Sequence, residues 1–300
     1  MKIAITGASG LIGTAASERL RANENDVVAL ARGDGTNQTW NPGTGALDES
    51  ALDGCDALVH LAAENVMGRW TNAKKARIAN SRIAPTEKLS RALAALANPP
   101  RVLISASASG FYGDRGDEIL DENSASGNDF LSHLVLDWEN ATRAAQDAGI
   151  RVVHLRLGVV LSERGGAFAA MLPAFRLGLG SMLGDGRQWW RWITLDDVTR
   201  IIEYALKNEG LSGAINVVAP QMVTNREFTR ALNGVLHRPN FFPIPASALQ
   251  LAMGEASTLI LSSARVMPQK LLDSGFEFQY PKLNSALRSL LNREDATAQK

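Results

Sequence analysis

The sequence has a single cysteine, few aromatic residues and no excess of either charge. Its 300 residues contain 31 Lys or Arg and 31 Asp or Glu, so the formal net charge is zero. A balanced chain has no long-range field that would draw it to nucleic acid or to anionic lipid. Cys55 has no second cysteine with which to form an internal disulfide, which fits a reducing compartment. We therefore expect no nucleic-acid partner.

Long apolar runs and metal-ligand spacings are also missing. No stretch approaches the roughly 18 apolar residues of a membrane span, so we expect no membrane association. Glycines interrupt the first apolar run before a secretory signal could form. The 4 histidines and the cysteine are scattered, without zinc-ligand spacing. These absences predict a cytoplasmic protein without a bound metal.

Short β-branched runs alternate with longer amphipathic segments in the first half of the chain. Each run is too apolar for a strand with one wet face, which favours a parallel sheet buried on both sides. The runs are 2–6, 27–31, 57–61, 102–105 and 152–155, and the helical segments are 11–22, 72–97 and 130–148. Right-handed crossovers then predict an α/β fold with a Rossmann-type, doubly wound sheet.

Recurring glycines and prolines distinguish the second half. A helix near 196–207 and a strand near 215–218 return to the sheet, and the chain after Pro220 is mostly helical. We predict a Rossmann domain over 1–160, completed by 190–218. A smaller, mainly helical substrate-binding and C-terminal lobe is expected from 161–189 and 219–292, followed by a flexible tail at 293–300.

The strongest motif is TGASGLIG at 6–13, between the first strand and the first helix. Gly7 permits a tight turn, Gly10 lets the backbone approach a pyrophosphate, and Gly13 lets the helix pack closely on the sheet. The phosphates then lie at the positive N-terminus of the helix. The motif predicts dinucleotide binding by Gly7, Ser9, Gly10, Leu11 and Ile12; a purely structural loop is the alternative.

The end of the second strand indicates which dinucleotide is bound. NAD enzymes usually have Asp or Glu there to hold the ribose 2′-hydroxyl. This chain has Ala31 followed by Arg32. A guanidinium can clamp a 2′-phosphate in bidentate fashion, whereas a carboxylate would repel it. We therefore predict NADP(H), with Arg32 on the 2′-phosphate; a solvated surface arginine is the alternative.

Further motifs extend over almost the whole chain. They are DALVHLAA at 56–63, Asn80-Ser81-Arg82, SASGFYG at 107–113, Phe130 with Trp138-Glu139, RLGVVL at 156–161, Gly184-Asp185-Gly186 with Trp192-Ile193, Ala219-Pro220 with Asn225, and His237-Arg238-Pro239. With the glycine turn, they resemble the extended short-chain dehydrogenase/reductase superfamily. The match is to its atypical, epimerase-like branch in the NAD-dependent epimerase/dehydratase family, which has a C-terminal helical domain of unknown function.

The resemblance implies roles for four further residues. Leu61 and Ala62 would line the path of the adenosine and pyrophosphate. Arg82 would reach a phosphate or ribose group of the cofactor, and Val160 would lie near the nicotinamide. For Leu61, Ala62 and Val160, plain core packing is the alternative.

The same resemblance exposes an omission. Ordinary members of the superfamily use a Ser or Thr, a Tyr that acts as general acid/base, and a Lys that lowers the pKa of the Tyr. Ser107 occupies the position of the Ser, but the Tyr-x-x-x-Lys motif is absent. Counting back from Trp138-Glu139 puts Leu131 at the tyrosine position and Val135 at the lysine position. Neither side chain carries a proton.

Other groups could supply the proton, whose transfer is worth roughly 10²–10⁴-fold in rate. Ser107 and Tyr112 are our catalytic candidates. The alternative for Tyr112 is that it shapes the loop before Gly113. Further candidates are Glu64 and, if the helix register differs from our count, Ser132 or an otherwise exposed His133.

A cluster of aromatic and basic residues, GRQWWRW, occupies 186–192. Tryptophan faces can hold a flat or sugar-like ligand, and Arg187 or Arg191 can pair with an acidic group. The alternative is packing between the lobes, with Asp196 as the N-cap of the next helix.

Two functions remain open. The first, which we favour, is an NADP(H)-dependent oxidoreductase or epimerase-like enzyme for a small polar substrate, for example a sugar-nucleotide-like one. The second is a catalytically silent NADP(H)-binding regulatory or sensor protein, suggested by Leu131 and Val135. The sequence identifies neither the substrate nor the choice between a monomer and a homodimer.

Overall fold

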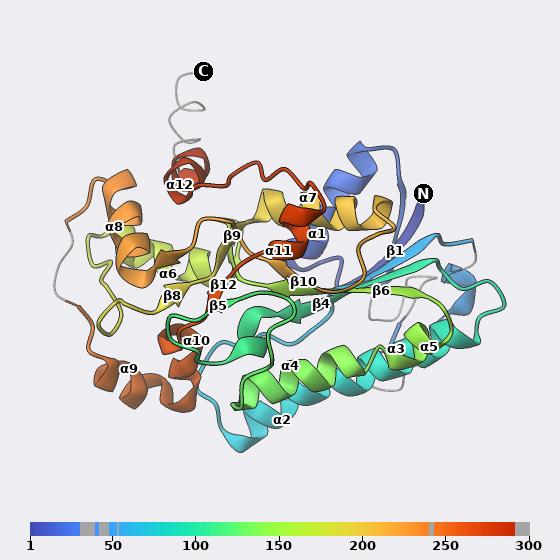
Figure 1. Ribbon diagram of the computed structural model, residues 1–300, viewed down its shortest axis with the longest axis horizontal. Helices are drawn as coiled ribbons and strands as arrows, with labels where there is room; N and C mark the ends of the chain where they lie inside the picture. Colours follow the sequence, from blue (N-terminus) through green and yellow to red (C-terminus); the bar gives the residue numbers. More distant parts are fainter. Residues whose placement is uncertain (31–39, 42–47, 53, 240–242, 292–300) are drawn as a thin grey trace.

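The computed structural model describes residues 1–30, 40–41, 48–52, 54–239 and 243–291 (Figure 1). Arg32 and the predicted tail at 293–300 lie outside the described residues. The main sheet has six strands in the order β10-β6-β4-β3-β1-β2, and every neighbouring pair is parallel. They are β1 (Lys2–Thr6), β2 (Asp26–Leu30), β3 (Ala57–His60), β4 (Val102–Ala108), β6 (Arg151–Leu157) and β10 (Gly213–Val217). The predicted fold class is therefore confirmed.

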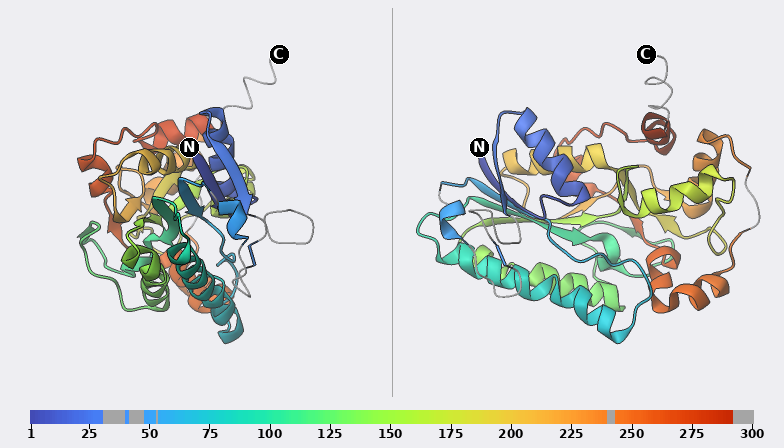
Figure 2. Two further views of the ribbon diagram at one scale, coloured as in Figure 1. Left: turned by 90° about the vertical axis from the view of Figure 1, so that its right-hand side faces the viewer. Right: turned by 180° about the vertical axis from the view of Figure 1, so that it is seen from behind.

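Helices cover both faces of this sheet, as the two views in Figure 2 show. On one face α1 (Leu11–Ala22) packs beside α7 (Leu195–Lys207). On the other face α3 (Ile83–Ala95) packs against α4 (Phe130–Asn140) and α5 (Arg143–Asp147). These layers bury the apolar runs of the sheet from both sides.

The long helix expected over 72–97 is broken in two. α2 (Asn72–Asn80) ends at Ser81, and α3 begins at Ile83. Pro85 lies in the first turn of α3, where its missing N–H costs nothing, but it could not donate to the carbonyl of Ser81 in a continuous helix. The segment expected over 130–148 also breaks, where the Thr142 hydroxyl donates to the carbonyl oxygen of Glu139.

Outside the main sheet the chain forms short paired strands that the sequence did not predict, and its second half adds several helices. The strand pairs are β7 (Val159–Leu161) with β9 (Trp192–Thr194), β8 (Trp189–Trp190) with β11 (Val223–Thr224), and β5 (Ile119–Leu120) with β12 (Arg265–Val266). The α-helices are α6 (Gly166–Arg176), α8 (Asn225–Val235), α9 (Ala246–Met253), α10 (Thr258–Leu261), α11 (Gln269–Asp273) and α12 (Leu283–Leu291). The 3-10 turns are η1 (Glu49–Leu52), η2 (Ser109–Tyr112) and η3 (Gly254–Ser257).

The C-terminal segment is tied into the main body of the fold. Leu271 and Phe276 join the core beneath α1 and α7. Asp197 in α7 is fully buried, and its carboxylate accepts the backbone N–H groups of Gln279 at 2.7 Å and Tyr280 at 3.0 Å. None of the helices in the described ranges is long and apolar enough to cross a membrane.

Candidate functional site

The candidate site lies where β1, β3, β4 and β6 end, which we call the carboxyl edge. The chain passes from β1 to β2 on one side and then to β3 on the other side of β1. This reversal is a topological switch point, the place where open α/β sheets bind ligands. The glycine turn follows β1, and Leu61 and Ala62 follow β3. Ser107 is the penultimate residue of β4, and Val160 follows β6.

The glycine turn is packed so closely that it excludes larger side chains. Gly7 has φ +70°, and a Cβ there would lie 2.8 Å from the backbone nitrogen of Ala62. A Cβ at Gly13 would lie 2.1 Å from the carbonyl oxygen of Gly7. Both positions therefore require glycine. The turn brings the first backbone amides of α1 to the carboxyl edge.

The N-terminus of α1 has no side-chain cap from the described residues. Its N-cap residue is Gly10, and its first turn contains no acidic residue. Side chains cap four other helices: Thr71 caps α2, Asp129 caps α4, Thr194 caps α7 and Thr224 caps α8, whereas α3, α6 and α9 resemble α1 in having no such cap. The first N–H groups of a helix have no partner within it. Those of α1 are thus available to an anion, which the helix dipole favours.

Three expected cofactor residues border this turn or the neighbouring strand end. Leu61 and Ala62 are half-buried, and their backbone abuts Gly7. Val160 is half-buried in β7, opposite Ile193 of β9. All three also pack against the core clusters of the sheet.

Arg82 is engaged with protein atoms. Its guanidinium donates to the carbonyl oxygens of Ile78 and Glu64 at 3.2 and 2.8 Å, and to Ser81 Oγ at 3.1 Å. It also lies 5.1 Å from the ring centroid of Trp138. Burial lowers the pKa of Arg82 to about 10. These contacts hold the loop after β3 against α2 and α4, and a direct contact with the cofactor stays a prediction.

Ser107 belongs to a buried polar network that the sequence did not predict. Its hydroxyl donates to Glu139 Oε1 at 2.6 Å. Glu139 in turn accepts two hydrogen bonds from Arg156, each of 2.9 Å. Burial raises the pKa of Glu139, but the hydrogen bonds and charge of Arg156 outweigh that effect and leave it lowered. Glu139 is therefore a carboxylate that fixes the hydrogen of Ser107.

Glu139 is the functional candidate that our sequence reasoning missed. Leu131, Val135 and Glu139 are spaced four residues apart along α4, so they lie on one face of the helix. Leu131 is half-buried beside Gly110, and Val135 is buried against Phe111 and Tyr112. Val135 is at the position where ordinary members of the superfamily have the Lys. One helical turn later, the same face of α4 carries the ionised carboxylate of Glu139. The signal was present in the spacing, because Glu139 follows Val135 by four residues.

Tyr112 is completely buried and its hydroxyl is enclosed by protein groups. The phenol oxygen lies 2.7 Å from Asn216 Oδ1 and 2.9 Å from the carbonyl oxygen of Asp121, and it accepts a hydrogen bond from Arg156 at 3.0 Å. Burial raises the pKa of Tyr112 to about 12. This environment favours the alternative for Tyr112, a structural role behind the loop at Gly113.

The other candidate proton donors are also engaged or exposed. Lys74 donates to Glu64 at 2.7 Å, and this hydrogen bond lowers the pKa of the Glu64 carboxyl. The Ser132 hydroxyl donates to Asp129 at 2.8 Å. His133 is exposed. Unlike Ser107, none of these three side chains is hydrogen-bonded to Glu139 among the contacts described.

The two buried histidines of the sheet are held by threonines. His60 Nδ1 lies 2.7 Å from Thr6 Oγ1, and its Nε2 lies 2.9 Å from Thr86 Oγ1. Burial lowers the pKa of His60 to about 4, so the ring is neutral near pH 7. His154 contacts the hydroxyl of Thr142 at 2.9 Å. Within the described ranges, no three His, Cys, Asp or Glu side chains gather as a metal site would require.

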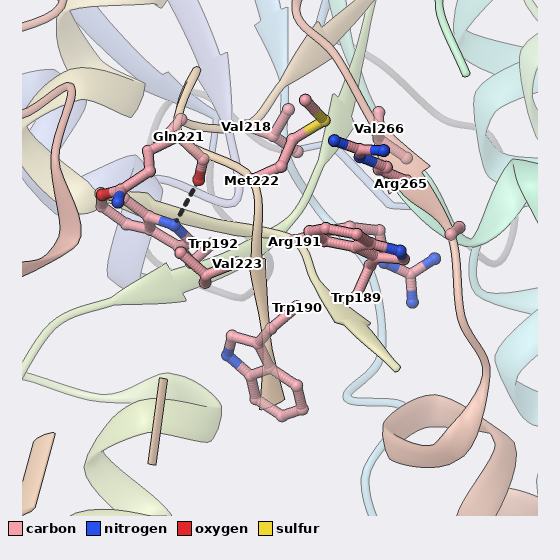
Figure 3. Close-up of a pocket in the computed structure, with 12 residues that line it drawn as sticks. Trp189, Trp190, Arg191, Trp192, Val218, Gln221, Met222, Val223, Arg265 and Val266 are labelled. Carbon is pink, nitrogen blue, oxygen red and sulfur yellow. Dashed lines mark hydrogen bonds between the residues drawn. The ribbon is translucent and has the colours of Figure 1, made fainter. Parts of the chain in front are cut away.

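The tryptophans of 186–192 are mostly packed (Figure 3). Trp190 and Trp192 are buried, and Trp192 donates to the carbonyl oxygen of Gln221 at 3.0 Å. Trp189 is half-buried and donates to Asp117 at 2.8 Å. The pocket beside them has a volume of about 10 Å³, enough for one water molecule. The N-cap of α7 is Thr194 and not Asp196.

Comparisons with known proteins agree with this geometry. The model of the NAD dependent epimerase/dehydratase family matches residues 3–219, and a domain of unknown function (DUF1731) matches 244–290. An epimerase family protein of Mycobacterium bovis is 42% identical over 290 residues, covering 95% of this chain and 96% of the relative. The epimerase family protein SDR39U1 of Mus musculus is 36% identical, covering 97% of this chain and 100% of the relative.

Solved structures give the same result. The human epimerase family protein SDR39U1 (isoform 2), solved with NADPH, matches with a TM-score of 0.89 and 32% identity, covering 98% of this chain and 100% of that one. A nucleoside-diphosphate sugar epimerase from Corynebacterium glutamicum matches with a TM-score of 0.80 and 37% identity, covering 100% of this chain and 60% of that one. The predicted resemblance is confirmed: the chain belongs to the NAD dependent epimerase/dehydratase family.

Proposed function

We propose that this protein binds NADP(H) at the carboxyl edge and uses it as an oxidoreductase or epimerase-like enzyme, in the cytoplasm, on a small polar substrate such as a sugar-nucleotide-like compound. The observation that carries the proposal is the uncapped N-terminus of α1 behind a turn that tolerates only glycine at Gly7 and Gly13. Such a turn fits a pyrophosphate, which needs backbone N–H donors and close approach.

The cofactor residues follow from this placement. Gly7, Ser9 and Gly10, with the first-turn amides of Leu11 and Ile12, hold the pyrophosphate. Leu61 and Ala62 border the adenosine side, and Val160 borders the nicotinamide side. Arg82 supports this arrangement through the loop that it holds.

The choice of NADP(H) over NAD(H) has two supports. In the sequence, Arg32 follows the last residue of β2 by two positions, and its guanidinium would be a suitable cation for the 2′-phosphate. The human SDR39U1 structure contains NADPH, whereas the UDP-glucose 4-epimerase of Thermus thermophilus, 19% identical to this chain, contains NAD. The more similar protein thus points to the phosphorylated cofactor.

Ser107 is the residue that we assign to the substrate oxygen. The bound nicotinamide would supply the exchange of a hydride. Because the hydrogen of Ser107 is directed at Glu139, Ser107 Oγ presents its lone pairs and can accept a hydrogen bond from a substrate hydroxyl. In oxidation, the hydroxyl proton moves to Ser107 as the hydrogen of Ser107 moves to Glu139. The reverse transfers protonate the oxygen in reduction.

A catalytically silent, NADP(H)-binding sensor is the second candidate function. The observation that favours it is the apolar character of Leu131 and Val135, at the positions where ordinary members carry the Tyr and Lys. The two candidates differ in whether the cofactor changes its redox state.

Two measurements test the proposal. Calorimetric titration with NADPH, NADP⁺, NADH and NAD⁺ should show tighter binding of the phosphorylated pair, and equal or tighter binding of NAD(H) would overturn the choice. Absorbance at the nicotinamide band should then change with a compound from a panel of carbonyls, alcohols and nucleotide sugars. The change should be lost in Ser107→Ala. Cofactor binding without any redox change across that panel would support the sensor.

A further inference from the structure

Three polar side chains lie in a row across neighbouring strands of the main sheet. Ser107 of β4 is paired with Arg156 of β6, and Arg156 is paired with Asn216 of β10. Paired residues of adjacent strands have their side chains on the same face of a sheet. All three side chains are buried, and Asn216 completely so. We call these three residues the polar row.

Two side chains from other elements join the members of the polar row. Glu139 of α4 accepts hydrogen bonds from both Ser107 and Arg156. Tyr112 of η2 lies between the other two members. Its phenol oxygen accepts a hydrogen bond from Arg156 Nη1 at 3.0 Å and lies 2.7 Å from Asn216 Oδ1. A continuous path of hydrogen bonds therefore runs from Ser107 to Asn216.

The far end of this path is held by the C-terminal region of unknown function. Asn216 Nδ2 donates to the carbonyl oxygen of Met267 at 2.8 Å. The backbone N–H of Asn216 donates to one carboxylate oxygen of Glu122 at 2.9 Å, and the other oxygen accepts the N–H of Lys270 at 3.2 Å. Met267 and Lys270 both belong to the segment that matches the domain of unknown function. That segment thus contacts the network of Ser107 through buried polar groups.

The carbonyl group of Met267 determines how the amide of Asn216 is oriented. A carbonyl oxygen can only accept, so the amide nitrogen faces Met267 and the amide oxygen faces Tyr112. The amide oxygen then receives the phenol hydrogen, which it shares with the carbonyl oxygen of Asp121 at 2.9 Å. A reversed amide would place an N–H group against the phenol oxygen. The contact with Met267 therefore leaves that oxygen free to accept from the guanidinium.

The guanidinium of Arg156 carries this order to the proposed site. Because Nη1 is engaged by Tyr112, Nε and Nη2 are directed at the carboxylate of Glu139, at 2.9 Å each. The guanidinium also lies 3.4 Å from the ring centroid of Phe111. Glu139 Oε1 in turn accepts the hydrogen of Ser107. Buried hydrogen bonds in such a chain polarise one another, so a change at one end is felt along it.

We propose that the C-terminal region of unknown function supports the proton transfer at Ser107, by holding the far end of the polar row through Met267 and Asn216. Asn216 and Tyr112 are then positioning residues, because they act through the guanidinium between them. The inference rests on the proposed function for the proton transfer itself. The hydrogen-bond path can be tested without cofactor or substrate.

The test follows the carboxyl group of Glu139 in the full chain. Glutamates are labelled with ¹³C at the carboxyl carbon, the signal of Glu139 is identified by its loss in Glu139→Gln, and its pH titration is recorded by NMR. The charged or titratable groups that face this carboxylate are Arg156 and His154 of β6, and Ser107 of β4 is a neutral donor to it. If the guanidinium is held less firmly, it offsets the burial of the carboxylate less well. Protonation then occurs at a higher pH.

Two variants break the path at different places. Tyr112→Phe removes the acceptor of Arg156 Nη1, and Asn216→Leu removes the link to the C-terminal region with a side chain of similar size. We expect the titration midpoint of Glu139 to rise by about one pH unit or more in Tyr112→Phe. The rise should be smaller in Asn216→Leu, because the carbonyl oxygen of Asp121 still accepts the phenol hydrogen. A midpoint that is unchanged in Asn216→Leu would overturn the proposal, whatever Tyr112→Phe shows.

The matched control is Asn233→Leu. Asn233 is also buried and donates through Nδ2 to a backbone carbonyl oxygen, that of Gly180 at 3.0 Å, but it lies in α8 outside the path. The midpoint of Glu139 should be unchanged in this variant, and an equal rise would contradict the assignment. If Asn216→Leu does not fold, Asn216→Thr takes its place, because threonine suits a strand. If the wild type unfolds in acid before its midpoint is reached, a variant midpoint above that transition is itself the rise.

Failure of this inference and failure of the proposed function give different results. NADPH binding is measured by calorimetry on each of the same proteins. Absence of binding in the wild type would count against the proposed function, and the Glu139 titration would still report on the path. Tight NADPH binding with an unchanged midpoint in Asn216→Leu would count against this inference alone.

Discussion

The buried pair of Glu139 and Arg156 offers a quantitative test of the network behind Ser107. Their side chains are only 10% and 6% exposed, and two 2.9 Å hydrogen bonds join them. Removing one partner of such a pair costs about 3–5 kcal/mol. Glu139→Gln keeps an acceptor oxygen, so we expect the lower end, about 3 kcal/mol. At about 2–4 °C per kcal/mol for a larger domain, Tm should fall by about 6–12 °C.

The control for this substitution lies on the next helix. Asp147→Asn removes the partner of Arg143, and both side chains of that pair are more than half exposed. Exposed pairs contribute about 0–1 kcal/mol, so this variant should melt close to the wild type. Thermal and urea unfolding of the three proteins measure the difference. A Glu139→Gln protein within 1 kcal/mol of the wild type would refute the reasoning about the network.

The pH dependence of the same pair has a definite sign. Because the folded-state pKa of Glu139 is lowered, its stabilising contribution is present above the ordinary glutamate pKa. That contribution is lost as pH falls through the lowered value. The stability difference between the wild type and Glu139→Gln should therefore be widest near neutral pH and should narrow in acid. A gap that widens in acid would contradict the charge assignment.

Three further predictions concern the glycine turn, the neutral histidine and the lysine position. Gly7→Ala places a Cβ on a residue with φ +70°, 2.8 Å from the backbone nitrogen of Ala62. The affinity for NADPH, measured by fluorescence titration, should therefore fall at least about tenfold. A variant with wild-type affinity would exclude this turn as the phosphate site. Because the pKa of His60 is lowered in the folded protein, this histidine is protonated at a higher pH in the unfolded chain than in the folded one. The free energy of unfolding should therefore fall by up to about 3 kcal/mol as the pH drops from 6.5 toward 4. In acid denaturation, His60→Gln should show a weaker dependence of stability on pH over that range. Val135→Lys buries a cation beside Phe111 and should cost about 3 kcal/mol or more in denaturant unfolding, whereas wild-type stability would place this residue at an open site.

The strands of the sheet could be predicted because their sequences are continuous apolar runs. The first strand and first helix match their expected bounds, 2–6 and 11–22. Two-residue strands such as β8 and β11 were missed, since so short a segment has no period to detect. The break between α2 and α3 was also missed, although Pro85 was a visible signal for it.

The side-chain contacts of the site could not be predicted in the same way. Ser107 and Arg156 lie opposite each other on β4 and β6, and Glu139 reaches both from α4. Residue types alone do not show which polar groups become partners when strands and helices pack. The same holds for Tyr112, whose enclosure depends on Asn216, 104 residues away. The motif predicts where the candidate site lies, and the fold adds the hydrogen-bond network of Ser107, Glu139 and Arg156.

The burial of Asp197 has a consequence for how the chain is divided. Its carboxylate is satisfied by amides at Gln279 and Tyr280, beyond the end of the segment that matches the epimerase family. A protein truncated after residue 219 would leave a buried anion without those donors and would expose the face that Phe276 covers. We therefore expect the two matched segments to unfold together, with the region of unknown function stabilising the first segment through these contacts.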